Sequence, residues 1–274
     1  MSIARPISRP ISRPISRGIV RGDAIDPDAA AWIAAREAAG ETITPQKVAA
    51  TDTFVRKCKE ELWWDKISRF FLPAAGLAAA NAICLRNLAS GQFVGEVSHF
   101  AGYVQSPDAN GHFDFQGLGS VVPTAASGHL MVALGNDPGP VNTFVALQGS
   151  ASQGARISRS STLNWRYNWT NTGNNFVNLT GFDREGVCLL SNRSTTFRRM
   201  SSLLEGSVQS GTNTSTASGT FNGATMMSDG TSERNDGFYY ASSTGAGFAS
   251  DAEEDAYALA VQKFINEYSG INFP

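Results

Sequence analysis

Charged residues are scarce in this sequence, and the scarcity bears on its fold class. Asp, Glu, Lys and Arg together make up 17% of the chain, against about a quarter in an average soluble domain. Gly, Ser, Thr and Asn take their place, and these residues are typical of turns and β-surfaces rather than of charged helices. The composition therefore predicts a body that is mainly β. The net charge of −2 gives no reason to expect binding to nucleic acid.

Long apolar runs and cysteine pairs are also missing. No segment approaches the roughly 20 apolar residues of a membrane-spanning helix, so we expect no membrane insertion. The N-terminus lacks the apolar core of a signal peptide, because Arg and Pro interrupt it every fourth residue. Cys58, Cys84 and Cys188 are widely spaced and odd in number. This favours buried free thiols over a disulfide framework and leaves an intermolecular bridge as the alternative.

Recognisable catalytic and metal-binding patterns are absent too. Enzymes that cleave glycans need two carboxylates flanking the scissile bond, but Glu96 stands alone on its expected strand, and Asp183 and Glu185 belong to a turn. The three histidines have neither the spacing of zinc ligands nor a nearby nucleophile. Residues 108–114 fit a turn better than a calcium loop. We expect no catalytic residue, metal or cofactor, and a glycan-degrading enzyme is the weakest functional hypothesis.

A repeated basic segment stands at the N-terminus. Residues 5–20 read Arg-Pro-Ile-Ser three times and then Arg-Gly-Ile-Val, and each proline excludes helix and keeps the preceding Arg extended. The first 21 residues have a charge of +5, which leaves 17 basic and 24 acidic residues, a charge of −7, for the rest. Such a segment can bind along a sheet edge or groove of a partner; the alternative is a solvated tail.

We favour the interpretation that residues 1–24 form a docking arm, because a solvated tail does not require such a regular repeat. Its expected contacts are Arg5, Pro6, Ile7, Arg9, Pro10, Ile11, Arg13, Pro14, Ile15 and Arg17.

Three helices and a long β region are expected after the arm. Asp26 with Pro27, and Thr44 with Pro45, are helix-start signals for two short helices within a linker over 25–66. Period-two alternation predicts strands over Ile67–Leu72, Phe93–Val104, His129–Leu134, Thr143–Leu147, Ser161–Asn171, Phe176–Phe182, Gly186–Asn192 and Gly237–Ala241. A capping box of Ser250 and Glu253 predicts an amphipathic helix over 250–269. Residues 67–274 are therefore expected to form a two-sheet sandwich with a C-terminal helix.

One expected strand carries a row of large aromatic residues. Strand alternation places Trp165, Tyr167 and Trp169 on one face, and Arg166 and Asn168 on the other. An exposed row can stack on sugar rings or contact a partner. The alternative, which we favour, is that the row belongs to the core between two sheets and that the polar face is the exposed one.

Three parts of the sequence are similar to one known family. The matching segments are Asn235–Ser242, Thr244–Phe248 and Ser250–Ala260 near the end, residues 191–206 before them, and residues 29–67 at the start. Together they resemble the concanavalin A-like (laminin-G-like) jelly rolls of bacteriophage and prophage structural proteins. The resemblance extends from about Leu62 to Asn272 and implies a jelly-roll sandwich.

The same resemblance implies a setting and a function. The chain is expected to be a virion structural protein, such as a fibre, collar or decoration component, that is assembled in the host cytoplasm and released by lysis. The arm would dock on capsid, collar or tail proteins. By analogy the protein would be a homo-oligomer, in particular a trimer, and its lectin-like body would attach to host-surface glycans. The alternative from another class is the carbohydrate-binding receptor tip of a tail fibre.

Overall fold

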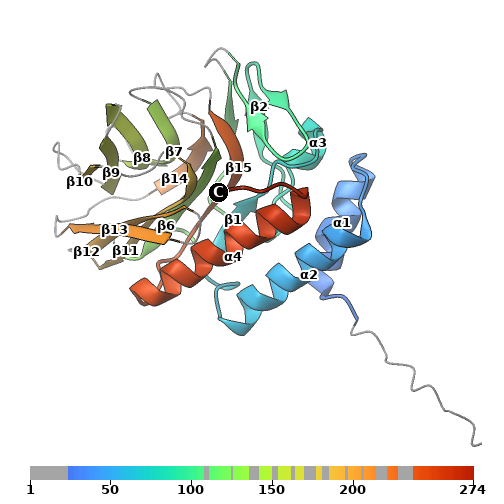
Figure 1. The fold of residues 1–274 in the computed structure, drawn as a ribbon, viewed down its shortest axis with the longest axis horizontal. Coiled ribbons are helices and arrows are strands. Elements are labelled where there is room, and N and C mark those ends of the chain that lie inside the picture. Colours follow the sequence, from blue (N-terminus) through green and yellow to red (C-terminus); the bar gives the residue numbers. More distant parts are fainter. Residues whose placement is uncertain are drawn as a thin grey trace, which may run out of the picture.

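The computed structural model describes residues 24–107, 111–124, 126–135, 142–149, 154–161, 164–169, 177–180, 185–194, 197–204, 207–213, 221–227 and 237–274. These residues form a mainly β protein, with two antiparallel sheets and helices at both ends of the described chain (Figure 1). The docking contacts predicted for residues 5–17 lie outside the described residues and stay a prediction. No helix in the described part is long and apolar enough to cross a membrane.

The two predicted N-terminal helices are present and begin where the sequence signals them. Helix α1 spans Pro27–Ala38, and the Asp26 side chain caps it by accepting a hydrogen bond from the amide of Asp28 at 3.0 Å. Helix α2 spans Pro45–Glu60, and the Thr44 hydroxyl accepts from the amide of Lys47 at 3.3 Å. In both helices proline occupies the first turn, where its missing amide costs nothing.

The predicted C-terminal helix is also confirmed. Helix α4 spans Asp251–Ser269, and the Ser250 hydroxyl accepts from the amide of Glu253 at 3.2 Å. The Glu253 carboxylate in turn accepts from the amide of Ala249 at 2.6 Å. Gly270 ends the helix in the left-handed conformation with a φ of 66°, which glycine adopts without steric cost.

Strands from distant parts of the chain alternate between the two sheets. The first sheet has the order β13-β12-β11-β6-β15-β4-β3, with β1 paired to β15, and the second has the order β10-β9-β8-β7-β14-β5-β2. The strands of the first sheet are β1 (Ile67–Phe71), β3 (Ser98–His99), β4 (Val104–Gln105), β6 (Gly128–Gly135), β11 (Gly186–Ser194), β12 (Phe197–Leu204), β13 (Ser207–Asn213) and β15 (Phe238–Gly245). Those of the second are β2 (Gln92–Val94), β5 (His112–Asp114), β7 (Asn142–Gly149), β8 (Gly154–Ser161), β9 (Asn164–Trp169), β10 (Val177–Thr180) and β14 (Phe221–Met226).

One strand predicted from the sequence was wrong in its extent. The single strand expected over Phe93–Val104 is divided into β2, β3 and β4, which belong to different sheets. Gly95 and Gly102 have positive φ angles of 76° and 113°, and such residues turn the chain rather than extend it. Strands β5, β8, β13 and β14 were not predicted as separate strands, and neither was the short helix α3 (Ala78–Asn81).

The central strands of the first sheet, such as β6, are buried on both faces. Leu130, Val132 and Leu134 of β6 belong to a hydrophobic cluster that also contains Phe144 and Ile157 of the second sheet. Met131 and Ala133, which alternate with them, belong to a second cluster shared with the helices. Strand alternation explains this division. The helix-side cluster is formed by residues that include Trp32, Phe54, Trp63, Phe70, Leu189, Tyr257, Val261, Phe264 and Tyr268.

The helices form a third layer against the outer face of the first sheet. Figure 1 shows α4 beneath the strands of this sheet, with α2 alongside α4. The rings of Phe54 on α2 and Phe264 on α4 are stacked, with centroids 4.4 Å apart and an interplanar angle of 5°. Residues 27–60 therefore contribute to the same core as the C-terminal helix. The three cysteines are free and buried, as the sequence predicts.

Candidate functional site

Four aromatic side chains meet beside strands β4 and β15. The ring of Tyr103 lies 4.7 Å from that of Phe100, 4.5 Å from that of Phe238 and 5.7 Å from that of Tyr240, measured between centroids. Phe100 is 41% exposed, whereas Tyr103, Phe238 and Tyr240 are half-buried. We call these four residues the aromatic surface. Each of the four residues leaves part of its area open to solvent.

The backbone around this surface explains how the rings come together. Gly102 has a φ of 113° and allows the tight turn in which the Phe100 amide donates to the Tyr103 carbonyl at 2.9 Å. Tyr240 lies over Gly135 of β6, where a β-carbon would come within 2.6 Å of the tyrosine ring. Phe273 supports the same ring at a centroid distance of 4.7 Å. The aromatic surface is therefore held by packing.

Two titratable residues, one within the aromatic surface and one next to it in the chain, have shifted pKa values. Burial raises the pKa of Tyr240, and the nearby Tyr103 and Glu185 raise it further. His99 precedes Phe100 in the chain, and its Nδ1 lies 3.1 Å from the amide nitrogen of Asn81. Because an amide nitrogen donates, Nδ1 accepts and the neutral ring carries its proton on Nε2. Burial lowers the pKa of His99, which favours this neutral form.

This arrangement suits binding by stacking and hydrogen bonding. Aromatic faces offer large rigid apolar areas, and tyrosine hydroxyls add polar groups at their edges. A sugar ring has the same two-sided character, with apolar C–H faces and hydroxyls around them. The surface therefore has the chemistry of a carbohydrate-binding platform.

The aromatic row predicted from the sequence lies on the other sheet. Trp165, Arg166, Tyr167, Asn168 and Trp169 all belong to β9, which pairs with β8 on one side and with the edge strand β10 on the other. The structure does not bring this row together with the aromatic surface, which borders the first sheet. The side chains of β9 lie outside the described part of the structure. The two alternatives for this row, sugar contact or inter-sheet core, stay open.

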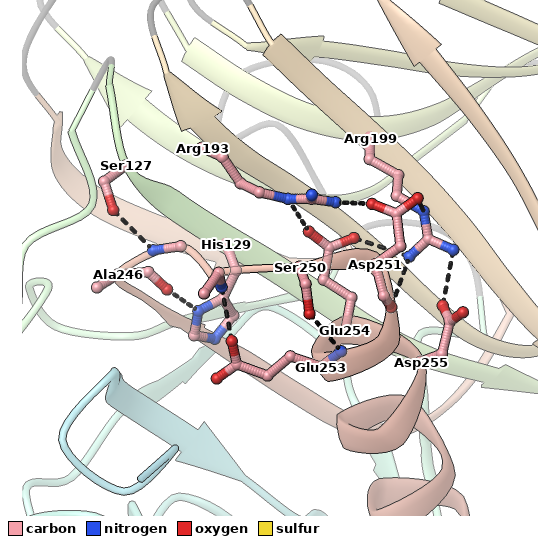
Figure 2. Close-up of polar contacts among 12 residues, drawn as sticks. Ser127, His129, Arg193, Arg199, Ala246, Ser250, Asp251, Glu253, Glu254 and Asp255 are labelled. Atoms are coloured by element: carbon pink, nitrogen blue, oxygen red, sulfur yellow. Dashed lines mark hydrogen bonds and ion pairs between the residues drawn. The ribbon is translucent and has the colours of Figure 1, made fainter. Parts of the chain in front are cut away.

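A cluster of charged side chains fastens α4 to the first sheet. Figure 2 shows Arg193 of β11 and Arg199 of β12 reaching toward three carboxylates in the first turns of α4. Glu254 accepts from Arg193 Nε at 2.9 Å and from Arg199 Nη1 at 2.8 Å. Arg199 Nη2 lies 2.7 Å from Asp255, and Arg193 also pairs with Asp251.

The cluster keeps its residues charged although it is largely buried. Burial works to lower the pKa of Arg199, but hydrogen bonds to Glu254 and Asp255 outweigh it and raise that pKa overall. The hydrogen bond from Arg193 lowers the pKa of Asp251. Carboxylates at a helix N-terminus also complement the positive end of the helix dipole. Because these charges are satisfied within the molecule, we interpret the cluster as a structural anchor for α4.

His129 is part of a second internal network. Its Nδ1 lies 2.7 Å from the Ala246 carbonyl and therefore donates, while Nε2 accepts from the Ser243 hydroxyl at 3.2 Å (Figure 2 shows the first of these contacts). The Ser243 hydroxyl lies 2.9 Å from that of Tyr257. Burial lowers the pKa of His129 to about 4, so the ring is neutral at pH 7. In the described residues no group of three His, Cys, Asp or Glu is placed to hold a metal.

An apolar groove runs between α2 and α4 on the outside of the molecule. It has a volume of about 320 Å³ and its floor includes the stacked rings of Phe54 and Phe264. Leu259 of α4 lines it and is 43% exposed. Lys57 and Lys263 line it as well, and each forms an ion pair four residues along its own helix, with Glu61 and Glu267. The remaining lining residues are Ala50, Thr53, Ala256, Ala260 and Glu267.

Comparisons with known proteins bear on the fold. No protein-family model and no curated protein matches the chain. Among solved structures, Trypanosoma rangeli sialidase in complex with the inhibitor DANA is similar with a TM-score of 0.50 at 9% identity, over 77% of this chain and 38% of the sialidase. At that identity the likeness concerns the fold alone.

Two further structures are similar at lower scores. Domain 4 of AbnA, a GH43 extracellular arabinanase from Geobacillus stearothermophilus, in complex with arabinotriose, has a TM-score of 0.49 at 10% identity, over 70% of this chain and 98% of that domain. The binding domain of botulinum neurotoxin DC in complex with SialylT has a TM-score of 0.49 at 12% identity, over 72% of this chain and 52% of that domain.

The aromatic surface was not predicted from the sequence. Phe238 and Tyr240 were recognised only as part of a strand, and Phe100 and Tyr103 were assigned to one extended strand. One local signal was present, because Phe100-Ala-Gly-Tyr103 contains a glycine between aromatic residues, which is typical of a turn. No local signal connects that turn with β15.

Proposed function

We propose that this chain is a structural protein of a bacteriophage particle that binds host-surface glycans through a concanavalin A-like jelly-roll body and has no catalytic activity. The observation that carries the glycan-binding part is the aromatic surface, in which Tyr103 contacts the rings of Phe100, Phe238 and Tyr240. Its rings are fixed by packing, so little conformational entropy is lost when a ligand stacks on them.

The proposed fold and setting draw on the strand order and on the sequence. Two antiparallel sheets contribute to one hydrophobic cluster, and strands far apart in the chain are neighbours within each sheet; jelly rolls have this type of order. The resemblance to phage structural proteins and the basic arm over residues 1–24 support the virion setting. In this proposal the arm docks on capsid, collar or tail proteins, and the protein is a homo-oligomer.

The charged residues support a binding role over a catalytic one. The carboxylates of Asp251, Glu254 and Asp255 are engaged by Arg193 and Arg199, where they attach α4 to the sheet. Carboxylates engaged by arginine in this way already have partners within the molecule. The receptor tip of a tail fibre is a variant of the same proposal and uses the same surface.

Glycan binding can be tested with the full-length chain on an array of bacterial surface polysaccharides. We expect binding that is lost in Phe100→Ala and Tyr103→Ala, because both remove ring area from the aromatic surface. Val122→Ala is the matched control, since Val122 is 45% exposed and lies outside this surface. Absence of binding by the unaltered chain would overturn the glycan proposal. If binding is lost only in Trp165→Ala or Trp169→Ala, the glycan site lies on β9 rather than on the aromatic surface.

The virion setting needs a separate experiment. Deletion of residues 1–23 is expected to prevent incorporation into phage particles while the remaining chain keeps its thermal unfolding transition. Normal incorporation of the shortened chain would contradict the role of the arm. This result does not depend on whether the aromatic surface binds a glycan.

A further inference from the structure

The groove between α2 and α4 is an apolar site on the surface of the protein. Leu259 stands in it with 43% of its area exposed, and the stacked rings of Phe54 and Phe264 form its floor. Lys57 and Lys263 are neutralised by Glu61 and Glu267 on their own helices. The groove therefore offers an apolar surface flanked by two lysine–glutamate ion pairs. Because each lysine is paired with a glutamate, the lysines do not add a net positive charge that would repel a basic segment.

We propose that this groove receives the N-terminal arm of a second copy of this chain. The inference rests on the arm being the docking element of the proposed function, and it names a partner for that arm. The arm has isoleucine at every fourth position, at Ile7, Ile11, Ile15 and Ile19. No other part of the sequence combines such a regular apolar repeat with so high a charge.

The spacing of the repeat fits the groove. In a chain with strand geometry successive isoleucines of the repeat share one face and are about 13 Å apart, at roughly 3.3 Å per residue. The groove-lining residues of α4 extend from Ala256 to Glu267, which is about 16 Å along a helix at 1.5 Å per residue. One or two isoleucines can thus enter the groove together. Since the repeat occurs three times, several registers are equivalent.

Charge also favours the arm as the occupant. The first 21 residues have a charge of +5 and the rest of the chain has a charge of −7. Glu267 lines the groove and pairs with Lys263 at 3.7 Å, and Glu61 pairs with Lys57. Arginines of the arm can replace these exposed lysines as partners, because arginine pairs with a carboxylate through two parallel hydrogen bonds. The acidic body and the basic arm are complementary parts of one sequence.

The place where the arm begins points to another copy rather than to the same molecule. The Ala24 carbonyl accepts from Arg56, and the Asp26 amide donates to Asp52 at 2.7 Å. Lys59 pairs with Asp26 as well, so the residues just after the arm contact one side of α2. At 3.6 residues per turn, positions 52, 56 and 59 lie on roughly the opposite side of α2 from the groove-lining positions 50, 53, 54 and 57.

An arm that leaves from that side must turn around the helix to enter its own groove. A neighbouring copy that faces this side of α2 presents its groove without requiring such a turn. Residues 1–23 can reach about 70 Å at roughly 3.1 Å per residue, which is long enough to reach such a copy. Exchange of arms between copies is a low-cost route to an oligomer.

Sedimentation velocity of the full-length chain tests this proposal. We expect concentration-dependent association that is weakened at least tenfold in Leu259→Lys, which places a positive charge among the groove residues. Leu77→Lys is the matched control, because Leu77 is 42% exposed and lies outside the groove. A triple variant, Ile7→Ser, Ile11→Ser and Ile15→Ser, is expected to weaken association to a similar degree. Excess synthetic peptide of residues 1–23 is expected to dissociate the assembly.

Three outcomes would overturn the inference. They are a full-length chain that stays monomeric at all concentrations, association of Leu259→Lys equal to that of Leu77→Lys, and association that resists the isoleucine substitutions. Each is distinguishable from failure of the proposed function. Particle incorporation that is lost on deletion of residues 1–23 while self-association persists would retain the virion role and refute the groove as the partner of the arm.

Discussion

Arg199 and Glu254 form an ion pair between the first sheet and helix α4, with 2.8 Å between Nη1 and Oε2. The Glu254 side chain has no solvent exposure and that of Arg199 has 3%. Arg193 donates to the same carboxylate at 2.9 Å. Glu254 thus bridges both arginines, whose other partners are the more exposed Asp251 and Asp255. Its loss removes the one fully buried carboxylate of these three.

Glu254→Gln is expected to destabilise the protein by about 3–5 kcal/mol, the usual cost of breaking a buried ion pair from one side. Glutamine keeps the shape of the side chain and removes only its charge. Urea unfolding followed by far-UV circular dichroism measures the change. Glu60→Gln, on the exposed side of α2, is the control and is expected to change stability by less than about 0.5 kcal/mol. Equal stability of the two variants would contradict the anchoring role of the cluster.

Stability is expected to fall as the pH is lowered from 6.5 toward 4, through protonation of His129. Burial lowers the pKa of His129 to about 4 in the folded protein, whereas an unfolded histidine titrates near 6.5. The unfolded state therefore binds the proton first, and stability is complete above pH 6.5 and decreases below it. The loss by pH 4 is on the order of 3 kcal/mol.

Urea unfolding at several pH values between 7.5 and 4.5 measures this dependence. His129→Gln, which can still donate to the Ala246 carbonyl, is expected to be less stable at pH 7 but to show a flatter profile between pH 6.5 and 5. A variant with the same slope as the unaltered protein would assign the pH dependence to another group, such as His99, whose pKa is also lowered by burial.

Gly135→Ala is expected to weaken glycan binding while leaving stability within about 1 kcal/mol. The new β-carbon would come within 2.6 Å of the Tyr240 ring, so the ring must move away from its position beside Tyr103. We expect a loss of affinity of at least about fivefold, or 1 kcal/mol, measured by isothermal titration calorimetry. Gly223→Ala is the control, since its β-carbon meets only the flexible side chain of Gln148. If the Gly135→Ala variant binds glycan as tightly as the unaltered protein, the position of the Tyr240 ring does not contribute to glycan binding.

The three cysteines are expected to resist thiol reagents in the folded protein. All three are buried, and burial raises the pKa of Cys188 to about 12 and also raises that of Cys58. Because the thiolate is the reactive form, Ellman's reagent should detect no thiol before denaturation and three per chain in guanidinium. Fewer than three after denaturation would indicate an intermolecular disulfide.

The ends of the helices could be predicted from the sequence because their causes are local. Asp26 with Pro27, Thr44 with Pro45, and Ser250 with Glu253 each act through hydrogen bonds that reach no further than three residues. Likewise, the mainly β body follows from a scarcity of charge and from period-two alternation. Strands of low apolar content, such as β13 with the sequence Ser-Val-Gln-Ser-Gly-Thr-Asn, have too weak a pattern to be recognised alone.

Only the tertiary structure decided which aromatic residues meet. Phe100 and Tyr103 lie in a turn before β4, whereas Phe238 and Tyr240 belong to β15, and the pairing of β4 with β15 brings them together. The same holds for Arg199 and Glu254, which are 55 residues apart in the chain. By itself the sequence determined where helices begin and end, the mainly β character and the charge of the arm. Strand pairing over long separations depends on the packing of the whole core, so the aromatic surface, the charged anchor and the α2–α4 groove arose only from the folded structure.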